Sequence, residues 1–140
     1  EGGAMMSGTG ETMQESEAFR RGLKVRAEIM GQAHVDRAMA TADGFGADMQ
    51  YLTTAYCWGE VWSRPGLDRR TRSLLVLVML TALNRTEELR QHVRAALTNG
   101  ASREDIREAF LQAAIYCGVP AAIASFRVAR EVFDAQAAQG

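Results

Sequence analysis

Two titratable side chains in this 140-residue chain lie in apolar settings, as groups that transfer protons often do. His92 follows Leu89 by three residues and precedes Ala96 by four, so the three share one side of a helix. Histidine titrates near neutral pH and is the most frequent general acid or base. His92 is therefore a candidate proton donor. The alternative is a core histidine bonded to a backbone carbonyl, with Glu88 either orienting it or lying in solvent.

Glu60 is the second candidate, because Tyr56, Trp58 and Trp62 surround it at helical spacings. In one interpretation these rings bury the carboxyl group partly, which favours a role in proton transfer. The alternative is a surface glutamate paired with Arg64, four residues along the helix. The aromatic rings then belong to the hydrophobic core.

Arginines cluster near both candidates. Arg69, Arg70 and Arg72 fall in the first turn of an expected helix, where positive charge opposes the helix dipole. Such a cluster gains most when a bound anion neutralises it, and Arg85 could join the same anion site. His34 begins a short helix and its role stays open. Together these residues could bind and protonate an anionic organic molecule.

The elements that position these residues are all helices. Apolar residues recur at helical spacings and no stretch alternates like a strand, so the sequence predicts an all-α fold. Asp68, Thr86 and Ser102 are expected caps. The apolar run from Leu74 to Leu80 predicts burial on every side, which a monomer of short helices would struggle to supply, so we expect self-association. The expected helices cover about 16–30, 34–42, 45–62, 69–83, 86–99, 102–116 and 119–133.

Composition excludes several classes of function. The net charge of −1 gives no footprint for nucleic acid or an anionic membrane, and the longest apolar run is too short to span a bilayer. Two histidines, and two cysteines sixty positions apart, make no metal-binding motif, so we expect no metal. No secretory signal is visible, which favours the cytoplasm. Residues 1–15 are expected to be disordered or tag-derived, and residues 16–140 to form one domain.

Four segments resemble the γ-carboxymuconolactone decarboxylase family, within the AhpD-like superfamily. They are GQAHVDRAMA (31–40), YCWGEVWSRPGLDRRTRS (56–73), ALNRTEELRQHVRAALTNGAS (82–102) and QAAIYCGVPAAIASFRVA (112–129). Redox members of the superfamily carry a CxxC motif three residues before a histidine. Aligning that histidine with His92 puts Arg85 and Glu88 where the cysteines would be, which argues against disulfide chemistry. The α/β-hydrolase half of fused relatives is also missing from this chain.

The resemblance implies an AhpD-like fold of six to seven helices, assembled as a homo-oligomer and commonly a hexamer. It implies decarboxylation of γ-carboxymuconolactone, a dicarboxylate lactone, to β-ketoadipate enol-lactone in protocatechuate catabolism, without a cofactor. His92 would be the general acid or oxyanion donor, and Glu60 would orient or reprotonate it, or donate the proton itself. Arg72, Arg85 and Arg70 would bind the carboxylates, and His34 and Trp62 would line the pocket.

Two alternatives stay open at this point. One is a non-catalytic helical module that binds an aromatic-pathway carboxylic acid through the same arginines. The other is a decarboxylase of the superfamily that acts on a related carboxylactone. Carbon dioxide release from the lactone, against binding without turnover, distinguishes the enzyme from the module.

Overall fold

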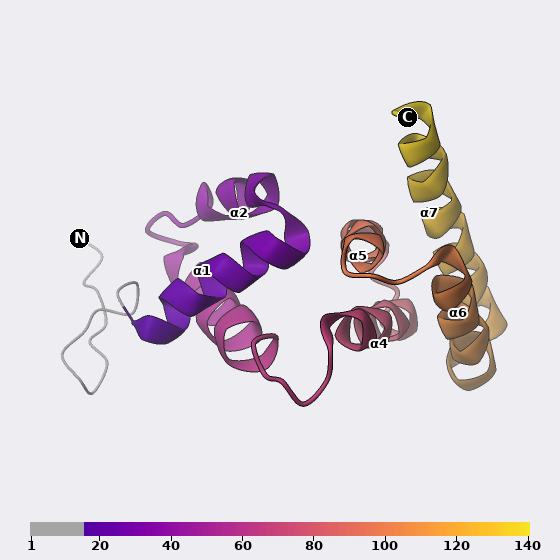
Figure 1. Ribbon diagram of the computed structural model, residues 1–140, viewed down its shortest axis with the longest axis horizontal. Helices are drawn as coiled ribbons and strands as arrows, with labels where there is room; N and C mark the ends of the chain where they lie inside the picture. The colour runs from indigo at the N-terminus through magenta and orange to yellow at the C-terminus, as the bar shows by residue number, and fades with distance from the viewer. Residues whose placement is uncertain (1–15) are drawn as a thin grey trace. The chain divides into compact units, whose positions relative to one another are not determined.

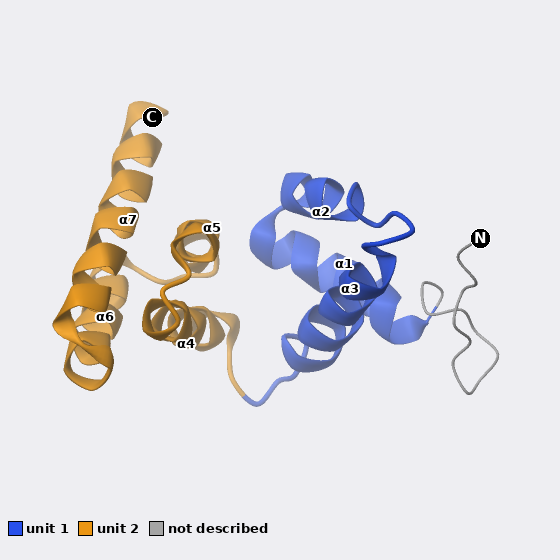
Figure 2. Ribbon diagram, turned by 180° about the vertical axis from the view of Figure 1, so that it is seen from behind, with its two compact units in different colours: residues 1–66 blue, residues 67–140 orange. Residues whose placement is uncertain are grey.

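The computed structural model describes residues 16–140. The expectation for residues 1–15 lies outside this range. The chain forms two compact units, the first ending at Gly66 and the second running from Leu67 to Gly140 (Figure 2). The expectation of one domain over 16–140 stays a prediction, and each unit is described by itself below.

The first unit contains α1 (Glu17–Met30), α2 (Gln32–Met39), α3 (Ala47–Leu52) and the π-helix η2 (Thr53–Val61), as Figure 1 shows. Ser16 caps α1, since its hydroxyl accepts a hydrogen bond from the Phe19 amide at 3.2 Å. Gly31 separates α1 from α2 with a φ of 93°, a conformation that glycine adopts without strain. The two expected helices in this region are thereby confirmed.

The expected helix over 45–62 is confirmed in part, because it changes type at Thr53. Residues from Thr53 to Val61 form a π-helix, and the Trp62 amide continues the pattern by donating to the Cys57 carbonyl, five residues back, at 2.9 Å. Long π-helices are rare and are often found at functional sites. The 3.6-residue periodicity did not indicate this change.

Two glycines let α1 and η2 approach each other closely. A Cβ added at Gly22 would lie 1.9 Å from the Thr54 carbonyl oxygen, and one added at Gly59 would lie 2.2 Å from the Ala18 carbonyl oxygen. No side chain fits at these separations. The backbones of the two helices are therefore in direct contact, which fixes the path of the π-helix in the first unit.

The second unit contains α4 (Arg69–Ala82), α5 (Thr86–Thr98), α6 (Arg103–Cys117) and α7 (Val119–Ala138). Asp68 caps α4 by accepting from the Thr71 amide at 2.7 Å, and Ser102 forms a capping box with Asp105 at the start of α6. The expected cap at Thr86 is wrong. Thr86 is the first residue of α5, and the N-cap position belongs to Arg85, which makes no side-chain capping bond.

The second unit packs around one hydrophobic core, but α4 is not buried on every side as expected. Its buried stripe is Ser73, Leu77 and Thr81, while Leu75 and Met79 are 42% and 56% exposed in the single chain. The reason is that α5, α6 and α7 contact α4 along one side. The core residues of this unit are Leu77, Leu89, Val93, Ala96, Ala101, Ile106, Phe110, Val128, Ala129 and Val132.

Helices account for all the regular secondary structure of residues 16–140, which confirms the predicted all-α class. None of the helices in this range has both the length and the apolar character needed to cross a membrane. The functional residues therefore lie on helix faces or at helix ends.

Candidate active site

His92 lies on the apolar side of α5, as the spacing predicted. Leu89 and Ala96, which share its side, are buried, and the imidazole itself is half-buried. Glu88 lies one turn before it. The pKa of Glu88 is lowered first by a hydrogen bond from Arg85, and the charge of His92 acts in the same direction. Arg85, Glu88 and His92 thus form an electrostatically connected group along the N-terminal half of α5.

A pocket of about 280 Å³ opens at the N-terminus of α5. It is lined by Asn84, Arg85, Thr86, Glu87 and Glu88. The Arg85 guanidinium donates a hydrogen bond to Glu88, which raises the pKa of Arg85. The N-cap residue of α5 makes no side-chain capping bond, but the Glu88 carboxylate bonds both Arg85 and its own amide, and Glu87 also lines the pocket. A substrate carboxylate could bind Arg85 here only by displacing Glu88, with the positive end of the helix dipole favouring it.

Arg70 and Arg72 lie at the start of α4, and the structure commits Arg70 to another role. Arg70 forms a two-pronged ion pair with Asp105 of α6, with contacts of 2.6 and 3.1 Å. This bond is the main reason that the pKa of Asp105 falls to about 2. Arg70 therefore fastens α4 to α6, and to bind a substrate carboxylate it would have to exchange partners. Arg72 is half-buried, and its role stays a prediction.

Glu60 is exposed, as the surface alternative predicts, and the neighbouring aromatic rings do not bury it. Its side chain is 52% exposed and accepts a hydrogen bond from Arg21 of α1 at 2.9 Å. The Trp58 and Trp62 rings are buried and stack on each other, with centroids 5.0 Å apart. The Glu60 carboxylate is instead held against α1. Its partner Arg21 also donates a hydrogen bond to the Gly59 carbonyl at 2.7 Å, so one arginine bonds both Gly59 and Glu60.

Trp62 and His34, the two predicted pocket residues of the first unit, lie in different settings. Trp62 is a buried residue whose side chain contacts the Cys57 thiol. His34 is half-buried on α2. Burial is the main cause that lowers its pKa, followed by the charges of Arg26 and Arg37. The neutral imidazole is therefore favoured, which suits a hydrogen-bonding role. Both residues keep their substrate-binding role as a prediction.

Sequence reasoning missed Arg26, a buried arginine in α1. Within residues 16–140 its guanidinium hydrogen-bonds neutral oxygens, those of Gln50 at 3.1 Å and Thr54 at 3.3 Å. Burial lowers the pKa of Arg26. The buried residues of α1 are Phe19, Gly22, Val25, Arg26 and Ile29. The spacing of Val25 and Ile29 was the signal that could have placed Arg26 inside.

Metal-ligating side chains do not gather in the part of the chain that the structure describes. No group of three or more His, Cys, Asp or Glu residues there could hold a metal ion. Cys57 and Cys117 are free thiols, and burial raises the pKa of the Cys57 thiol.

Comparison with known proteins relates both units to enzymes that remove carboxyl groups. The chain is 42% identical over 121 residues to 4-carboxymuconolactone decarboxylase of Acinetobacter baylyi, covering 86% of this chain and 90% of that protein. It is 41% identical over 116 residues to the nitrosuccinic acid decarboxylase npaB of Metarhizium robertsii, covering 83% and 81%. Residues 47–131 match the carboxymuconolactone decarboxylase family, and this chain therefore belongs to that family.

Proposed function

We propose that this protein decarboxylates 4-carboxymuconolactone, without a cofactor, to give β-ketoadipate enol-lactone in protocatechuate catabolism. The observation that carries the proposal is the group of Arg85, Glu88 and His92 along α5, beside a pocket at an uncapped helix N-terminus. An anion site next to a titratable histidine is what a decarboxylase of a dicarboxylic acid requires. The 42% identity to the Acinetobacter baylyi enzyme supports the choice of substrate.

The substrate itself supplies the electron acceptor. The departing carboxylate sits on the ring carbon γ to the lactone carbonyl and is conjugated with it through a carbon–carbon double bond. When this carboxylate leaves as carbon dioxide, its bonding electron pair moves through the double bond to the carbonyl oxygen, giving a dienolate. A proton added at the α carbon then yields the enol-lactone. The protein has to hold the carboxylates, stabilise the oxyanion and deliver one proton.

The residues of the second unit divide these tasks. Arg85, on exchanging Glu88 for the substrate, and the N-terminus of α5 hold a carboxylate, and His92 donates a hydrogen bond to the oxyanion or a proton to the carbon. Arg72 is the proposed second carboxylate ligand, and Arg70 could contribute only by releasing Asp105. Glu60, His34 and Trp62 keep their proposed roles in proton transfer and binding.

A second substrate follows from the other relative. Nitrosuccinic acid, which the Metarhizium robertsii protein is named for, is also a dicarboxylic acid with an electron acceptor built into it. Its nitro group can take the electron pair that decarboxylation releases, just as the lactone carbonyl can. The features common to both compounds are two carboxylates and an internal acceptor, and these are the features that an arginine site with one proton donor can serve.

Incubation of the purified protein with each compound separates the possibilities. We expect carbon dioxide release and loss of 4-carboxymuconolactone, with kcat/KM at least tenfold higher than for nitrosuccinic acid. A higher kcat/KM for nitrosuccinic acid would mean that the protein is a decarboxylase with a different substrate. Saturable binding of both compounds without carbon dioxide release would support the non-catalytic binding module. Neither binding nor turnover would refute the proposal.

We also propose that the protein is a cytoplasmic homo-oligomer, and specifically a hexamer. Leu75 and Met79 are exposed on α4, and Ile115 and Tyr116 on α6 are each 80% exposed in the single chain. Apolar surface of this extent usually marks an interface. Light scattering should give a mass near six times that of the 15.3-kDa chain, and a monomer would refute this. Fractionation of the source cells tests the location.

A further inference from the structure

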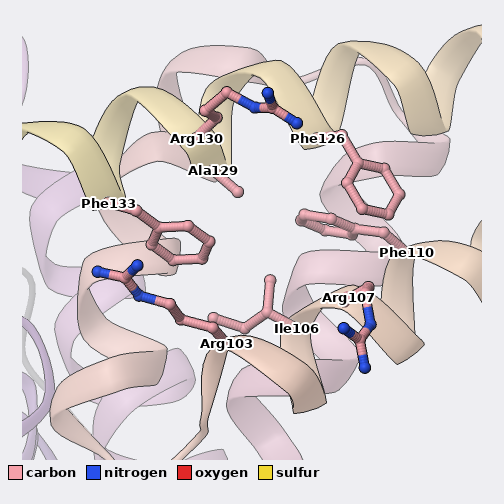
Figure 3. A pocket seen from close by; sticks show the side chains of 8 residues that line it. All are labelled: Arg103, Ile106, Arg107, Phe110, Phe126, Ala129, Arg130 and Phe133. Carbon is pink, nitrogen blue, oxygen red and sulfur yellow. The ribbon is translucent and has the colours of Figure 1, made fainter.

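A second pocket lies between α6 and α7, inside the second unit (Figure 3). Its volume is about 110 Å³, and none of its residues has a proposed role in decarboxylation. It is separate from the pocket at the N-terminus of α5, which has a different set of lining residues. The lining residues are Arg103, Ile106, Arg107, Phe110, Phe126, Ala129, Arg130 and Phe133.

Aromatic rings face each other across this space. Figure 3 shows Phe133 on one side and Phe110 and Phe126 on the other, with the Ile106 side chain pointing into the gap between them. Phe110 and Phe126 make an edge-to-face pair with centroids 5.6 Å apart. An apolar cavity of about 150 Å³ is known to hold benzene. A slightly smaller pocket that is open on one side can therefore take one flat ring.

The rim of the pocket carries three arginines, of which Arg107 has an acidic neighbour, Glu108, at 3.7 Å. The Arg103 guanidinium lies 4.6 Å from the centre of the Phe133 ring, and Arg130 extends from α7 along the opposite edge (Figure 3). Within residues 16–140, neither arginine takes part in an ion pair, and no acidic residue lines the pocket.

Two acids near these arginines in sequence are bonded elsewhere, whereas Glu104 and Asp134 are exposed and line no part of the pocket. Asp105 bonds Arg70, and Glu131 bonds Arg90 of α5. Arg103 and Arg130 are both exposed, so each attracts an anion at the rim through a charge that solvent partly screens. The charge pattern therefore calls for a ligand that is negative at one end.

We propose that this pocket binds a planar aromatic carboxylate. The ring lies between Phe133 and the Phe110–Phe126 pair, and the carboxylate lies at the rim, where Arg130 donates a hydrogen bond to it and Arg103, over Phe133, adds positive charge. A small inorganic anion would leave the aromatic walls uncovered, and a neutral ring would leave the Arg130 guanidinium without an acceptor. An aromatic carboxylate satisfies both sets of groups, and its binding does not depend on the proposed decarboxylation.

Benzoate is the simplest probe, and methyl-detected NMR of the native oligomer locates it. We expect saturable shifts of the Ile106 methyl signals, caused by the ring current of the ligand, with a Kd on the order of 1 mM for so small a molecule. The signals of Ile115, exposed elsewhere on α6, should not move. Benzamide has the same shape without the charge and should bind at least tenfold more weakly.

Two variants test the two halves of the proposal. Ala129→Leu fills the buried floor of the pocket without changing charge and should abolish the Ile106 shifts. Arg130→Gln should weaken benzoate binding about tenfold, as expected for a charged hydrogen bond. Arg94→Gln, an equal charge change on the exposed side of α5, is the control and should have little effect.

Four results would overturn the proposal, the first three of them in the native oligomer. These three are an Ile106 signal that does not respond to benzoate, equal affinity for benzamide, and an Arg94→Gln effect as large as that of Arg130→Gln. A response that appears only after the oligomer is dissociated would also overturn it, because a second copy of the chain would then occupy the pocket.

Discussion

The two candidates for proton transfer, His92 and Glu60, lie on helices of different kinds. His92 lies on a regular α-helix, on the side that packs into the core of the second unit, with Glu88 one turn away. Glu60 lies near the end of a nine-residue π-helix, half in solvent and bonded to Arg21. One residue is thus positioned by ordinary helix periodicity and the other by contacts between helix backbones.

This difference shows two ways of presenting a polar group. A regular helix needs only the right spacing to place a histidine at the edge of a core. A π-helix is intrinsically less favourable and persists where its surroundings support it. In the first unit that support comes from Gly22 and Gly59, which bring α1 and η2 into contact, and from the bonds of Arg21. Variants of His92 and of the residues around Glu60 test this comparison.

Replacement of His92 should have the largest effect. We expect His92→Ala to lower kcat on the order of 100-fold, because one oxyanion donor typically contributes about 3 kcal/mol to the transition state. Glu60→Gln should lower kcat only about tenfold, since an exposed, ion-paired carboxylate fits a supporting role better than that of the donor. Steady-state kinetics with 4-carboxymuconolactone measures both.

Gln91→Ala, a change at the exposed neighbour of His92 on α5, is the control and should keep normal turnover. Circular dichroism should show that all three variants are folded. If Glu60→Gln proved more damaging than His92→Ala, the roles would be exchanged and the π-helix would carry the proton donor. A folded His92→Ala variant with near-normal kcat would remove His92 from the mechanism.

The close contact between α1 and η2 gives the next largest effect. Gly59→Ala should lower the free energy of unfolding by about 3 kcal/mol, because its Cβ would lie 2.2 Å from a backbone oxygen and the two helices would have to separate. Gly66→Ala, where nothing lies within 4 Å, should change it by less than about 0.5 kcal/mol. Urea unfolding measures both values. Equal values would show that the contact does not hold the π-helix.

Most of the second unit could be predicted from the sequence. Asp68 and Ser102 cap helices as expected, because the N-cap preference is local and chemical. The burial of α4 was predicted less well, since hydrophobicity alone does not tell which face a neighbour covers. Ser73 and Thr81 lie inside while Leu75 and Met79 are exposed, because helix packing selects a stripe, on which a buried hydroxyl either bonds a facing helix or, as with Ser73 within residues 16–140, makes no hydrogen bond. Thr81, for example, bonds Ser125 of α7 at 2.7 Å.

The candidate site was predicted unevenly for the same reason. His92 could be placed because a single helix determines its neighbours. The surroundings of Glu60 could not be, because they depend on α1, thirty-nine residues away, and on a change to π geometry that no residue type encodes. Arg26 was missed because charged residues are seldom buried. An arginine next to an apolar stripe is therefore predicted to lie at the solvent edge of the helix, whereas Arg26 is buried.

The acid behaviour of the second unit provides a smaller test. The pKa of Asp105 is lowered from 3.8 to about 2, first by the Arg70 bond and then by the Ser102 amide. The lowered pKa means that Asp105 stabilises the fold above about pH 4, and that this stabilisation is lost as the pH falls toward 2. Asp105→Asn should therefore lower the urea midpoint at pH 7, and the difference from the wild type should shrink below pH 4. Asp134→Asn, exposed on α7, is the control, and a difference that stays constant with pH would contradict the ion pair.

The first unit should respond at a higher pH, and more weakly. The pKa of His34 is lowered from 6.5 by burial and by Arg26 and Arg37, so the unfolded chain takes up the proton before the folded chain does. Because the unfolded state then binds more protons, stability should fall as the pH drops from about 7 through this window. His34→Gln should remove that part of the slope, and the C2 proton of His34 should titrate below pH 6.5 in NMR spectra. A midpoint at or above 6.5 would mean that an acid, not the two arginines, faces the imidazole, and His34 would then be charged when substrate binds.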